Sequence, residues 1–295
     1  MTLVLLAGLG GTLAALEATG QAVRVLRTDM RAYCQAFEAV TYLGYGPDDP
    51  MVARRWLHDI KTFATFYVPS APRHVHPWVW SVAMAPMRAT VFRDASVVRV
   101  MSASGALPAY LASRWWGVPY VVHVGYDAAT VAEVLGHPIR ARSQRWLRRL
   151  TLSRAAAVTA SRPGLWPNAI LLENGVDVEH FKPQHRTLGP AAVLYIGRLA
   201  REKNLEVLIR ACRRASVRLI LSGDGPERPA LEDLAIAEDA DVVFLGVQPH
   251  ELLPTICATA DIFALPSLTE GSPKALLEAM ACALPCVVSP AATVV

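Results

Sequence analysis

The chain has 295 residues, enough for two domains of ordinary size with a hydrophobic core in each. Hydrophobic residues make up 53% of the sequence and charged residues 18%, which excludes an intrinsically disordered protein. The net charge of +4 is uneven: residues 1–185 hold 19 Lys and Arg against 12 Asp and Glu, whereas residues 186–295 hold 10 against 13, so the first part favours an anionic partner such as a membrane surface, a phosphate or a nucleic acid.

Neither the cysteines nor the apolar segments indicate secretion or a membrane span. The five cysteines form no CxxC pair and no zinc-binding spacing, so we expect buried thiols in a reducing compartment. The opening stretch MTLVLLAG lacks basic residues and is followed by glycines and Glu17, which predicts a buried strand and a helix instead of a signal peptide. No charge-free run reaches about 18 residues, the length that a membrane-spanning helix needs.

Short apolar segments alternate with longer segments of helical periodicity along the chain. Strands are predicted at residues 2–7, 96–101, 119–124, 156–161 and 169–174, and again at 192–197, 217–223, 241–246, 261–266 and 285–289. Helices are predicted between them, for example at 105–117, 204–215, 227–238 and 249–260. Continuous apolar strands separated by helices are typical of parallel sheets covered on both faces, so we expect two doubly wound, Rossmann-like α/β domains.

The polar segment at residues 181–190 marks the expected boundary between these domains. It carries Pro183, Gly189 and Pro190, and the alternation of strand and helix restarts after it. The sequence therefore predicts an N-terminal domain at residues 1–185 and a C-terminal domain at 186–295. Because ligands of such sheets bind beyond the carboxyl ends of the strands, we expect the two domains to face each other across a ligand-binding cleft.

The loop after the first predicted strand, AGLGGT, is rich in glycine and contains Gly8, Gly10 and Gly11. A dinucleotide-binding G-x-G-x-x-G fingerprint would also need glycine at position 13, where Leu13 stands, although Asp29 follows at the distance expected of a ribose ligand. A nicotinamide-dependent enzyme would leave the motifs of the second half unexplained, so it is the less favoured interpretation.

The segment HPIRARSQRWLRRL, residues 137–150, predicts a basic amphipathic helix with an aromatic side chain, Trp146. Its arginines are Arg140, Arg142, Arg145, Arg148 and Arg149. Such a helix binds anionic lipid; the alternative is a surface helix that packs an apolar stripe on the sheet.

Two basic residues follow the strand predicted at 192–197, in the segment RLAREKN. Arg198 is expected in the loop, and Lys203 beside Asn204, a suitable N-cap for the next helix. Two cations beside the exposed N–H groups of a helix start favour the binding of a di-anion. The alternative is solvated surface charge, which is what we expect of Arg201 and Glu202.

The segment EGSPKALLE, residues 270–278, begins and ends with a glutamate. Ser272 fits the N-cap of a helix and Pro273 its first turn. Glu278 lies among apolar and small residues, so we expect it near the core and beside the cleft, where hydroxyl groups of a ligand would be suitable partners for a buried carboxylate. Taken alone, the two glutamates are better explained as surface charge.

Several motifs of the chain occur together and in order. They are NGVDVEHFKP, GRLAREKN, SGDGPER, FLG and ALPSLTEGSPKALLEAMACALPCVVS. From about Ala157 to the end, this set resembles the GT-B glycosyltransferases of family 4 (group 1). The resemblance implies two Rossmann-like domains and a metal-independent enzyme that transfers a sugar, with retention at the anomeric carbon, from a nucleotide diphosphate donor.

The resemblance also implies a role for individual residues. Arg198 and Lys203 would bind the diphosphate and stabilise the charge of the leaving group, and Glu270, the first glutamate of the E-x7-E motif, would contact the donor sugar. The remaining donor contacts would come from Gly10 and Gly11 under the phosphates, Gly271, Ser272 and Pro273 at the sugar and phosphate, Glu278 at the ribose, and the backbone near Gly223 and Phe244 at the base. The donor is expected to be a UDP- or GDP-sugar, with no cofactor and no metal. Asn174 and Gly175 belong to the loop that leads to the boundary segment, or form a plain turn.

Family members usually present a histidine at the end of a strand near the reacting sugar. Gly125 stands where that histidine is common, and His123 lies two residues earlier on the same face of the strand. His123 is therefore a candidate catalytic residue or a core histidine, and Asp127 is the other polar candidate. The acceptor would be a lipid, a polysaccharide or a small molecule, and nucleic acid is not an expected partner. We expect a cytoplasmic protein, with the inner face of the cell membrane as the alternative place of action.

Members of the family usually continue past PCVVS, and they carry glycine where Ala283 stands. We therefore expect an incomplete second domain. An inactive donor-binding or membrane-docking fragment is the alternative to an active glycosyltransferase; an epimerase or phosphorylase of the same fold is less favoured.

Overall fold

The computed structural model describes residues 1–8, 11–18, 25–26, 29–67, 75, 77–185 and 189–292. The chain divides into two compact units, which are described separately below. The first comprises Met1–Ala129 and Ile139–Leu172, and the second Thr130–Pro138 and Glu173–Val295. Each unit is a parallel sheet with helices, so the expected α/β class is confirmed.

The first unit contains a seven-stranded parallel sheet in the order β3-β2-β1-β4-β5-β6-β7. Its strands are β1 (Thr2–Leu6), β2 (Ala39–Gly44), β3 (Phe63–Tyr67), β4 (Val97–Val100), β5 (Tyr120–Val124), β6 (Ala157–Ala160) and β7 (Ile170–Leu171). Its helices are α1 (Leu13–Ala18), α2 (Met30–Ala36), α3 (Asp49–Leu57), α4 (Pro77–Val82), α5 (Met84–Met87), α6 (Ala89–Arg93), α7 (Ala106–Trp116) and α9 (Pro138–Leu152), while α8 (Ala128–Val134) lies across the division between the units.

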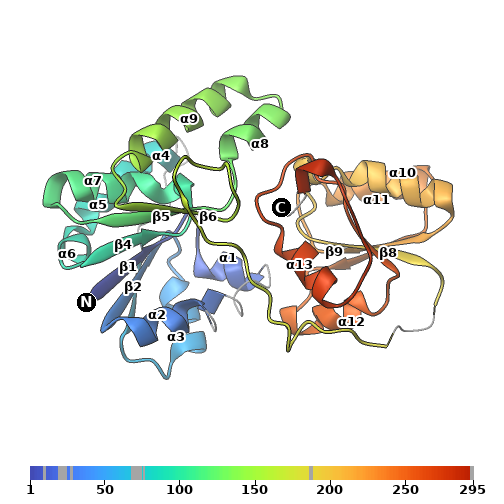
Figure 1. Ribbon diagram of the computed structural model, residues 1–295, viewed down its shortest axis with the longest axis horizontal. Coiled ribbons are helices and arrows are strands. Elements are labelled where there is room, and N and C mark those ends of the chain that lie inside the picture. The colour runs from blue at the N-terminus through green and yellow to red at the C-terminus, as the bar shows by residue number, and fades with distance from the viewer. Residues whose placement is uncertain are drawn as a thin grey trace. The chain divides into compact units, whose positions relative to one another are not determined.

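Alternation along β1 explains why helices cover both faces of this sheet. Val4 and Leu6 belong to one core cluster, whereas Leu3 and Leu5 belong to another, and all four are buried. Figure 1 shows α1, α2 and α3 on one face of the sheet and α5 and α7 on the other. A strand that is apolar on both faces needs helices on both sides of the sheet, because an uncovered face would be exposed to water.

The second unit contains a five-stranded parallel sheet in the order β10-β9-β8-β11-β12. Its strands are β8 (Ala192–Ile196), β9 (Arg218–Ser222), β10 (Val242–Gly246), β11 (Ile262–Leu265) and β12 (Cys286–Val288). Its helices are α10 (Leu205–Ala215), α11 (Arg228–Ala237), α12 (Leu253–Cys257) and α13 (Lys274–Ala281), with short 3-10 turns at Arg201–Lys203 and His250–Leu252. Figure 1 shows α10 and α11 on one face of this sheet and α12 and α13 on the other.

The ten strands predicted from the sequence are all present, but β2 and β3 were not predicted. The side chains of β3 alternate between half-buried and exposed, and Thr41 and Thr65 interrupt the apolar runs of the two strands. Their apolar signal is therefore weaker than that of β1 or β8.

The boundary between the units also differs from the predicted one after residue 185, because residues 173–185 pack with the second unit. Phe181 is 2% exposed and its ring lies against that of His250, with the centroids 5.1 Å apart. An aromatic side chain buried in this way ties its segment to the unit that surrounds it.

The strand order of the second unit determines where a ligand can bind. The chain runs outward from β8 through β9 to β10 on one side, and the strands β11 and β12 lie on the other side. The loops after β8 and β11 therefore leave the sheet in opposite directions, and the gap between such loops is the usual ligand site of an open α/β sheet. These two loops carry RLAREKN and PSLTEGSP.

No helix in the part of the chain that the structure describes is long and apolar enough to span a membrane.

Candidate functional site

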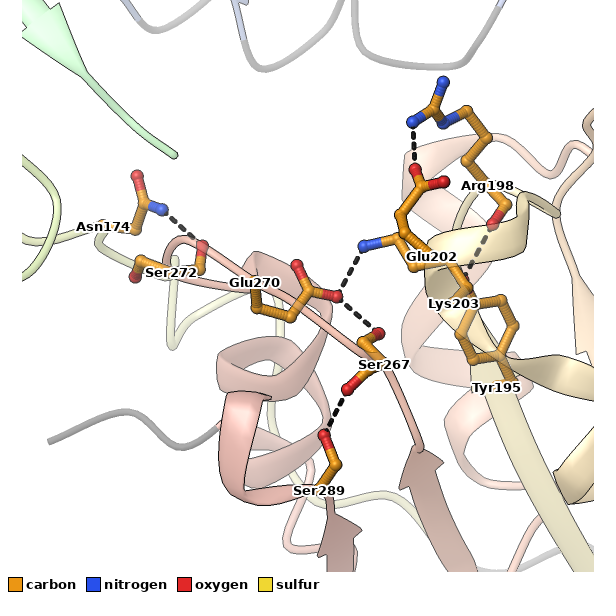
Figure 2. A network of polar contacts seen from close by, with 9 residues as sticks. All are labelled: Asn174, Tyr195, Arg198, Glu202, Lys203, Ser267, Glu270, Ser272 and Ser289. Atoms are coloured by element: carbon orange, nitrogen blue, oxygen red, sulfur yellow. Dashed lines mark hydrogen bonds and ion pairs between the residues drawn. The ribbon is translucent and has the colours of Figure 1, made fainter. Parts of the chain in front are cut away.

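An ion pair joins the two loops at the carboxyl edge of the second sheet. Lys203 Nζ donates to Glu270 Oε1 at 2.5 Å, and Ser267 Oγ donates to the same oxygen at 2.7 Å (Figure 2). The side chains of Lys203 and Glu270 are 18% and 10% exposed, and Ser267 is buried. The predicted catalytic residues Lys203 and Glu270 are thus brought together, although 67 positions separate them.

Two serines that the sequence analysis did not single out hold Glu270 in place. Ser267 lies three residues before Glu270, and its carbonyl oxygen accepts a hydrogen bond from Ser289 Oγ at 2.5 Å. Ser289 directly follows β12, so the residue after the neighbouring strand fixes the turn that contains Ser267 and Glu270. The motif ALPSLTE contains Ser267, but the pattern gives no sign that its hydroxyl is buried.

Arg198 is paired with Glu202 of the 3-10 turn, four residues further along the chain. Glu202 is 7% exposed, so the expectation of a solvated Arg201–Glu202 pair is wrong for Glu202. The Arg198 side chain is 65% exposed, and Tyr195 Oη donates to its carbonyl oxygen at 2.9 Å (Figure 2). Burial and the charges of Glu270 and Glu202 raise the pKa of Tyr195, so its hydroxyl stays protonated as a donor.

Gly223 allows the loops after β8 and β9 to cross in contact. Its φ is +139°, and a Cβ built there would lie 1.9 Å from the carbonyl oxygen of Gly197. Gly225 is equally constrained, because a Cβ would lie 2.2 Å from Leu199 O. The backbone near Gly223 was expected to contact the base of a ligand, whereas the close approach in the structure is to the chain itself.

Phe244 of β10 is half-buried beside this crossing. Its ring lies against Arg228, the first residue of α11. The guanidinium of Arg228 lies 5.8 Å from the centre of the Phe244 ring, and Arg228 Nε donates to Glu232 Oε1 at 2.7 Å. Gly223, Phe244 and Arg228 thus surround one corner of the carboxyl edge, where the base pocket was predicted. Nothing in the sequence pattern singles out Arg228 as part of this corner.

The turn Gly271-Ser272-Pro273 leads into α13, whose first residue is Lys274. Pro273 occupies the N-cap position, one residue later than predicted for the cap at Ser272, and no side chain caps the helix. The Ser272 carbonyl instead accepts a hydrogen bond from Asn174 Nδ2 at 2.7 Å (Figure 2). Asn174 is therefore more than a turn residue, because it fixes this turn across 98 positions of sequence.

Asn204 precedes α10 as predicted but does not cap it. Its φ of +56° and ψ of +41° are left-handed, and its side chain makes no hydrogen bond to the start of the helix. The Nδ2 atom donates to Pro266 O at 3.4 Å instead, which adds another link between the loops after β8 and β11.

Glu278 is 5% exposed in the second turn of α13, as the sequence analysis expected for a residue near the core. Its Oε1 lies 3.4 Å from His250 Nε2, in the loop that follows β10. The histidine was missed, because nothing in the sequence pattern pairs a residue of the QPHEL segment with α13.

The candidates of the first unit lie at the carboxyl edge of its own sheet. His123 is half-buried in β5, and its Nδ1 lies 3.0 Å from Thr159 Oγ1 of β6. Asp127 Oδ1 accepts a hydrogen bond from Ala129 N at 3.0 Å and pairs with Arg148 Nη1 at 2.9 Å. Gly11 donates to Gly8 O at 2.8 Å and accepts from Tyr45 N at 3.1 Å. Gly10 lies outside the described residues.

The edge of the second sheet is chemically suited to an anionic, hydroxyl-rich ligand. Arg198 and Lys203 supply positive charge, and the N-termini of α10 and α13 supply backbone N–H groups and the positive ends of two helix dipoles. Glu270 and Glu278 supply acceptors for hydroxyl groups. Among the described residues, no group of three or more His, Cys, Asp or Glu side chains is arranged to hold a metal ion.

Comparison with known proteins relates the chain to glycosyltransferases. Residues 177–295 match the family described as glycosyl transferases group 1. The chain is 30% identical to a GDP-mannose-dependent alpha-mannosyltransferase of Mycobacterium tuberculosis, over 69% of this chain and 60% of that protein. It is 29% identical to an alpha-D-kanosaminyltransferase of Streptomyces kanamyceticus, over 61% of this chain and 54% of that protein. The chain thus spans less than two thirds of the length of these curated relatives.

A solved structure supports the fold over nearly the whole chain. The sucrose-phosphate synthase of Thermosynechococcus elongatus superposes with a TM-score of 0.79 at 19% identity, covering 99% of this chain and 82% of that one. Residues 177–295 thus match the glycosyl transferases group 1 family, and the two Rossmann-like units of the chain have the GT-B fold of the solved glycosyltransferases.

Proposed function

We propose that the chain transfers a sugar from a UDP- or GDP-sugar to an acceptor hydroxyl, with retention at the anomeric carbon and without a divalent metal ion. The observation that carries the proposal is the Lys203–Glu270 pair at the point where the strand order of the second sheet reverses. Two relatives support the reaction class by their names, which specify transfer of mannose from GDP-mannose and transfer of kanosamine.

In this proposal, the diphosphate of the donor lies against Lys203, Arg198 and the start of α10. As the bond between sugar and diphosphate breaks, negative charge grows on the leaving phosphate oxygens. Positive charges and N–H groups that are already in place stabilise this charge without reorganising, which is the usual source of electrostatic catalysis. Arg198 is the more exposed of the two cations, and it is already paired with Glu202 beside the proposed position of the phosphate.

Glu270 and Glu278 would then bind the two sugars of the donor. Glu270 accepts hydroxyl groups of the transferred sugar beside the Gly271-Ser272-Pro273 turn, and Glu278 accepts those of the ribose. The base would lie near Gly223 and Phe244. His123 stays a proposed contributor near the reacting sugar, and Gly10 and Gly11 proposed contacts of the phosphates.

Retention is proposed because the motifs of the chain resemble those of the family 4 glycosyltransferases, which retain the anomeric configuration; the proposed step uses no side-chain nucleophile. The acceptor oxygen would attack from the side on which the diphosphate departs, and a leaving phosphate oxygen would take the acceptor proton. The anomeric configuration of the product, read by NMR from its anomeric proton, tests this step; an inverted product would contradict it.

The acceptor is proposed to be a lipid, a polysaccharide or a small molecule. Helix α9 supports a membrane-bound acceptor, since Ile139, Trp146 and Arg142 on it are exposed. We propose action in the cytoplasm, at the inner face of the cell membrane when the acceptor is a lipid.

A thermal unfolding series with UDP-, GDP- and ADP-sugars in the presence of a chelator tests donor binding. A ligand at about 100 times its Kd adds about 2.7 kcal/mol to the free energy of unfolding, so the cognate donor raises Tm in a concentration-dependent manner. Glu270→Ala is expected to abolish the rise, whereas Asp233→Ala, which removes an exposed carboxylate on α11, keeps it.

A protein that gives no Tm rise with any of these sugars, or a Glu270→Ala variant that responds like the parent, would overturn the proposed donor site. Release of nucleoside diphosphate in the presence of lipid and saccharide acceptors then separates a transferase from a protein that binds the donor without turnover.

A further inference from the structure

His250 packs between the rings of His180 and Phe181 on one side and the buried carboxylate of Glu278 on the other. Its ring stacks on that of His180, with the centroids 5.5 Å apart and an angle of 23° between the planes. The Phe181 ring meets it edge-on at 5.1 Å and 74°. His180 Nε2 also donates to the His250 carbonyl oxygen at 3.2 Å, so both the backbone and the ring of His250 are fixed.

The Nε2 atom of His250 lies 3.4 Å from Oε1 of Glu278, the residue predicted to bind the ribose of the donor. The two side chains are 15% and 6% exposed, so neither is freely solvated. The carboxylate of Glu278 can rotate about its terminal side-chain torsions, and a hydrogen bond from a fixed donor such as His250 Nε2 selects one orientation.

We infer that His250 is a positioning residue, which orients Glu278 so that the carboxylate receives the ribose hydroxyls of the donor. The inference rests on the proposed function, because it presupposes that a nucleoside diphosphate binds at this edge. His180 and Phe181 form the support of His250, so the segment that precedes the second sheet takes part in nucleoside binding without touching the nucleoside.

The geometry makes a specific prediction about which part of the ligand depends on His250. An effect through Glu278 is confined to the ribose hydroxyls, whereas a general loss of folding or of loop order weakens every contact of the nucleotide. A nucleotide that lacks both hydroxyls therefore separates positioning from mere structural support.

Isothermal titration with UDP, GDP and ADP first identifies the diphosphate that the parent chain binds. Kd is then measured for that diphosphate and for its 2′,3′-dideoxy form, with the parent chain and with His250→Ala. We expect His250→Ala to weaken binding of the ribose form about tenfold, the effect of losing one hydrogen bond to a charged partner. Binding of the dideoxy form is expected to change less than twofold.

Two further variants complete the experiment. His250→Gln keeps a side-chain N–H donor and is expected to restore most of the affinity for the ribose form. His185→Ala, which removes an exposed histidine of the same unit, is expected to leave both affinities unchanged.

Equal weakening of both ligands by His250→Ala, or no weakening of either, overturns the inference while the proposed donor site stands. A parent chain that binds none of the three diphosphates overturns the proposed function and the inference together.

Discussion

Asp49 is fully buried at the start of α3, where it closes the glycine-rich turn of the first unit. Its Oδ1 accepts hydrogen bonds from Leu13 N at 2.7 Å and Ala14 N at 3.4 Å, which fixes the start of α1. Within the described residues, its Oδ2 has no hydrogen-bond partner. Burial is the main cause that raises the pKa of this carboxyl, and the backbone hydrogen bonds from Leu13, Ala14 and Gly46 oppose it.

The raised pKa predicts that Asp49 makes folding less favourable as the pH rises. In the unfolded chain an aspartate titrates near pH 3.9, so above about pH 4 the folded chain retains this proton longer than the unfolded chain does. The contribution is thus present below pH 4 and is lost as the pH rises through the folded pKa. Urea unfolding at a series of pH values is expected to show Asp49→Asn gaining stability over the parent in this window, since it removes the buried charge and keeps the Oδ1 acceptor.

Asp94 provides the control, because it is an exposed aspartate of the same unit and its replacement removes the same charge. Asp94→Asn is expected to follow the pH dependence of the parent. If the free energy of unfolding of Asp49→Asn runs parallel to that of the parent at every pH, the buried carboxyl has the same pKa in the folded and the unfolded chain, which would contradict the prediction.

At the scale of the elements, the loops after β8 and β9 cross and fix the carboxyl edge of the second sheet, where the sugar donor is proposed to bind. Gly223 N donates to Gly246 O at 2.8 Å, Gly197 N to Ser222 O at 2.9 Å, and Leu199 N to Asp224 O at 2.9 Å. Each loop therefore supplies the hydrogen bonds of the next one, and displacing one of them moves the segment that carries Arg198.

Gly223→Ala is expected to disrupt this crossing. The added Cβ would lie 1.9 Å from Gly197 O, at a φ of +139° that an alanine avoids, so about 3 kcal/mol or more of stability should be lost. Gly175→Ala serves as the control, because a Cβ there meets no atom within 4 Å and its φ is not left-handed. Chemical denaturation of both variants measures the difference; equal stabilities would mean that the loops separate at little cost.

The elements that the sequence predicted correctly are those whose signal is local. Strands such as β1, β8 and β9 are continuous apolar runs, and α10 and α11 show clear helical periodicity. The exact start of α13 was missed by one residue, because Ser272 and Pro273 are both suitable near a helix start and only the tertiary contact with Asn174 separates them.

At the scale of the whole molecule, the site was predictable only as far as the family motifs reach. Arg198, Lys203, Glu270 and Glu278 lie in motifs, and strand order alone explains how Lys203 meets Glu270. His250 and Ser289 were missed because their roles arise from contacts across the fold, and Glu202 was predicted as surface charge because its burial is not apparent from its neighbours in the sequence. In the described part of the Gly-rich segment 8–12, Gly11 N donates to Gly8 O, and the contacts of Gly10 and Gly11 with the donor phosphates stay a prediction.

The positive charge of the first unit is also distributed unevenly over α9. Arg148 faces inward, since it pairs with Asp127 and lies 5.7 Å from the centre of the Trp166 ring. Arg140, Arg142 and Arg149 are exposed, as are Ile139 at 86% and Trp146 at 66%. Residues 139, 142, 146 and 149 follow the spacing of one helix face, so cations and large apolar side chains share a single exposed surface.

This surface of α9 predicts binding to anionic membranes. Each arginine near a charged bilayer contributes about 1 kcal/mol, so replacing Arg142 and Arg149 of this surface, together with the exposed Arg140 in the first turn of the same helix, by glutamine should weaken binding roughly a hundredfold. Co-sedimentation with phosphatidylcholine vesicles that contain phosphatidylglycerol measures this change. The matched control replaces Arg210, Arg213 and Arg214 of α10, three exposed arginines of the second unit, and removes the same net charge. Binding should then stay near that of the parent, because these residues share no face with an exposed aromatic. An equal loss in both triple variants would show that net charge alone attracts the chain, and would contradict docking through α9.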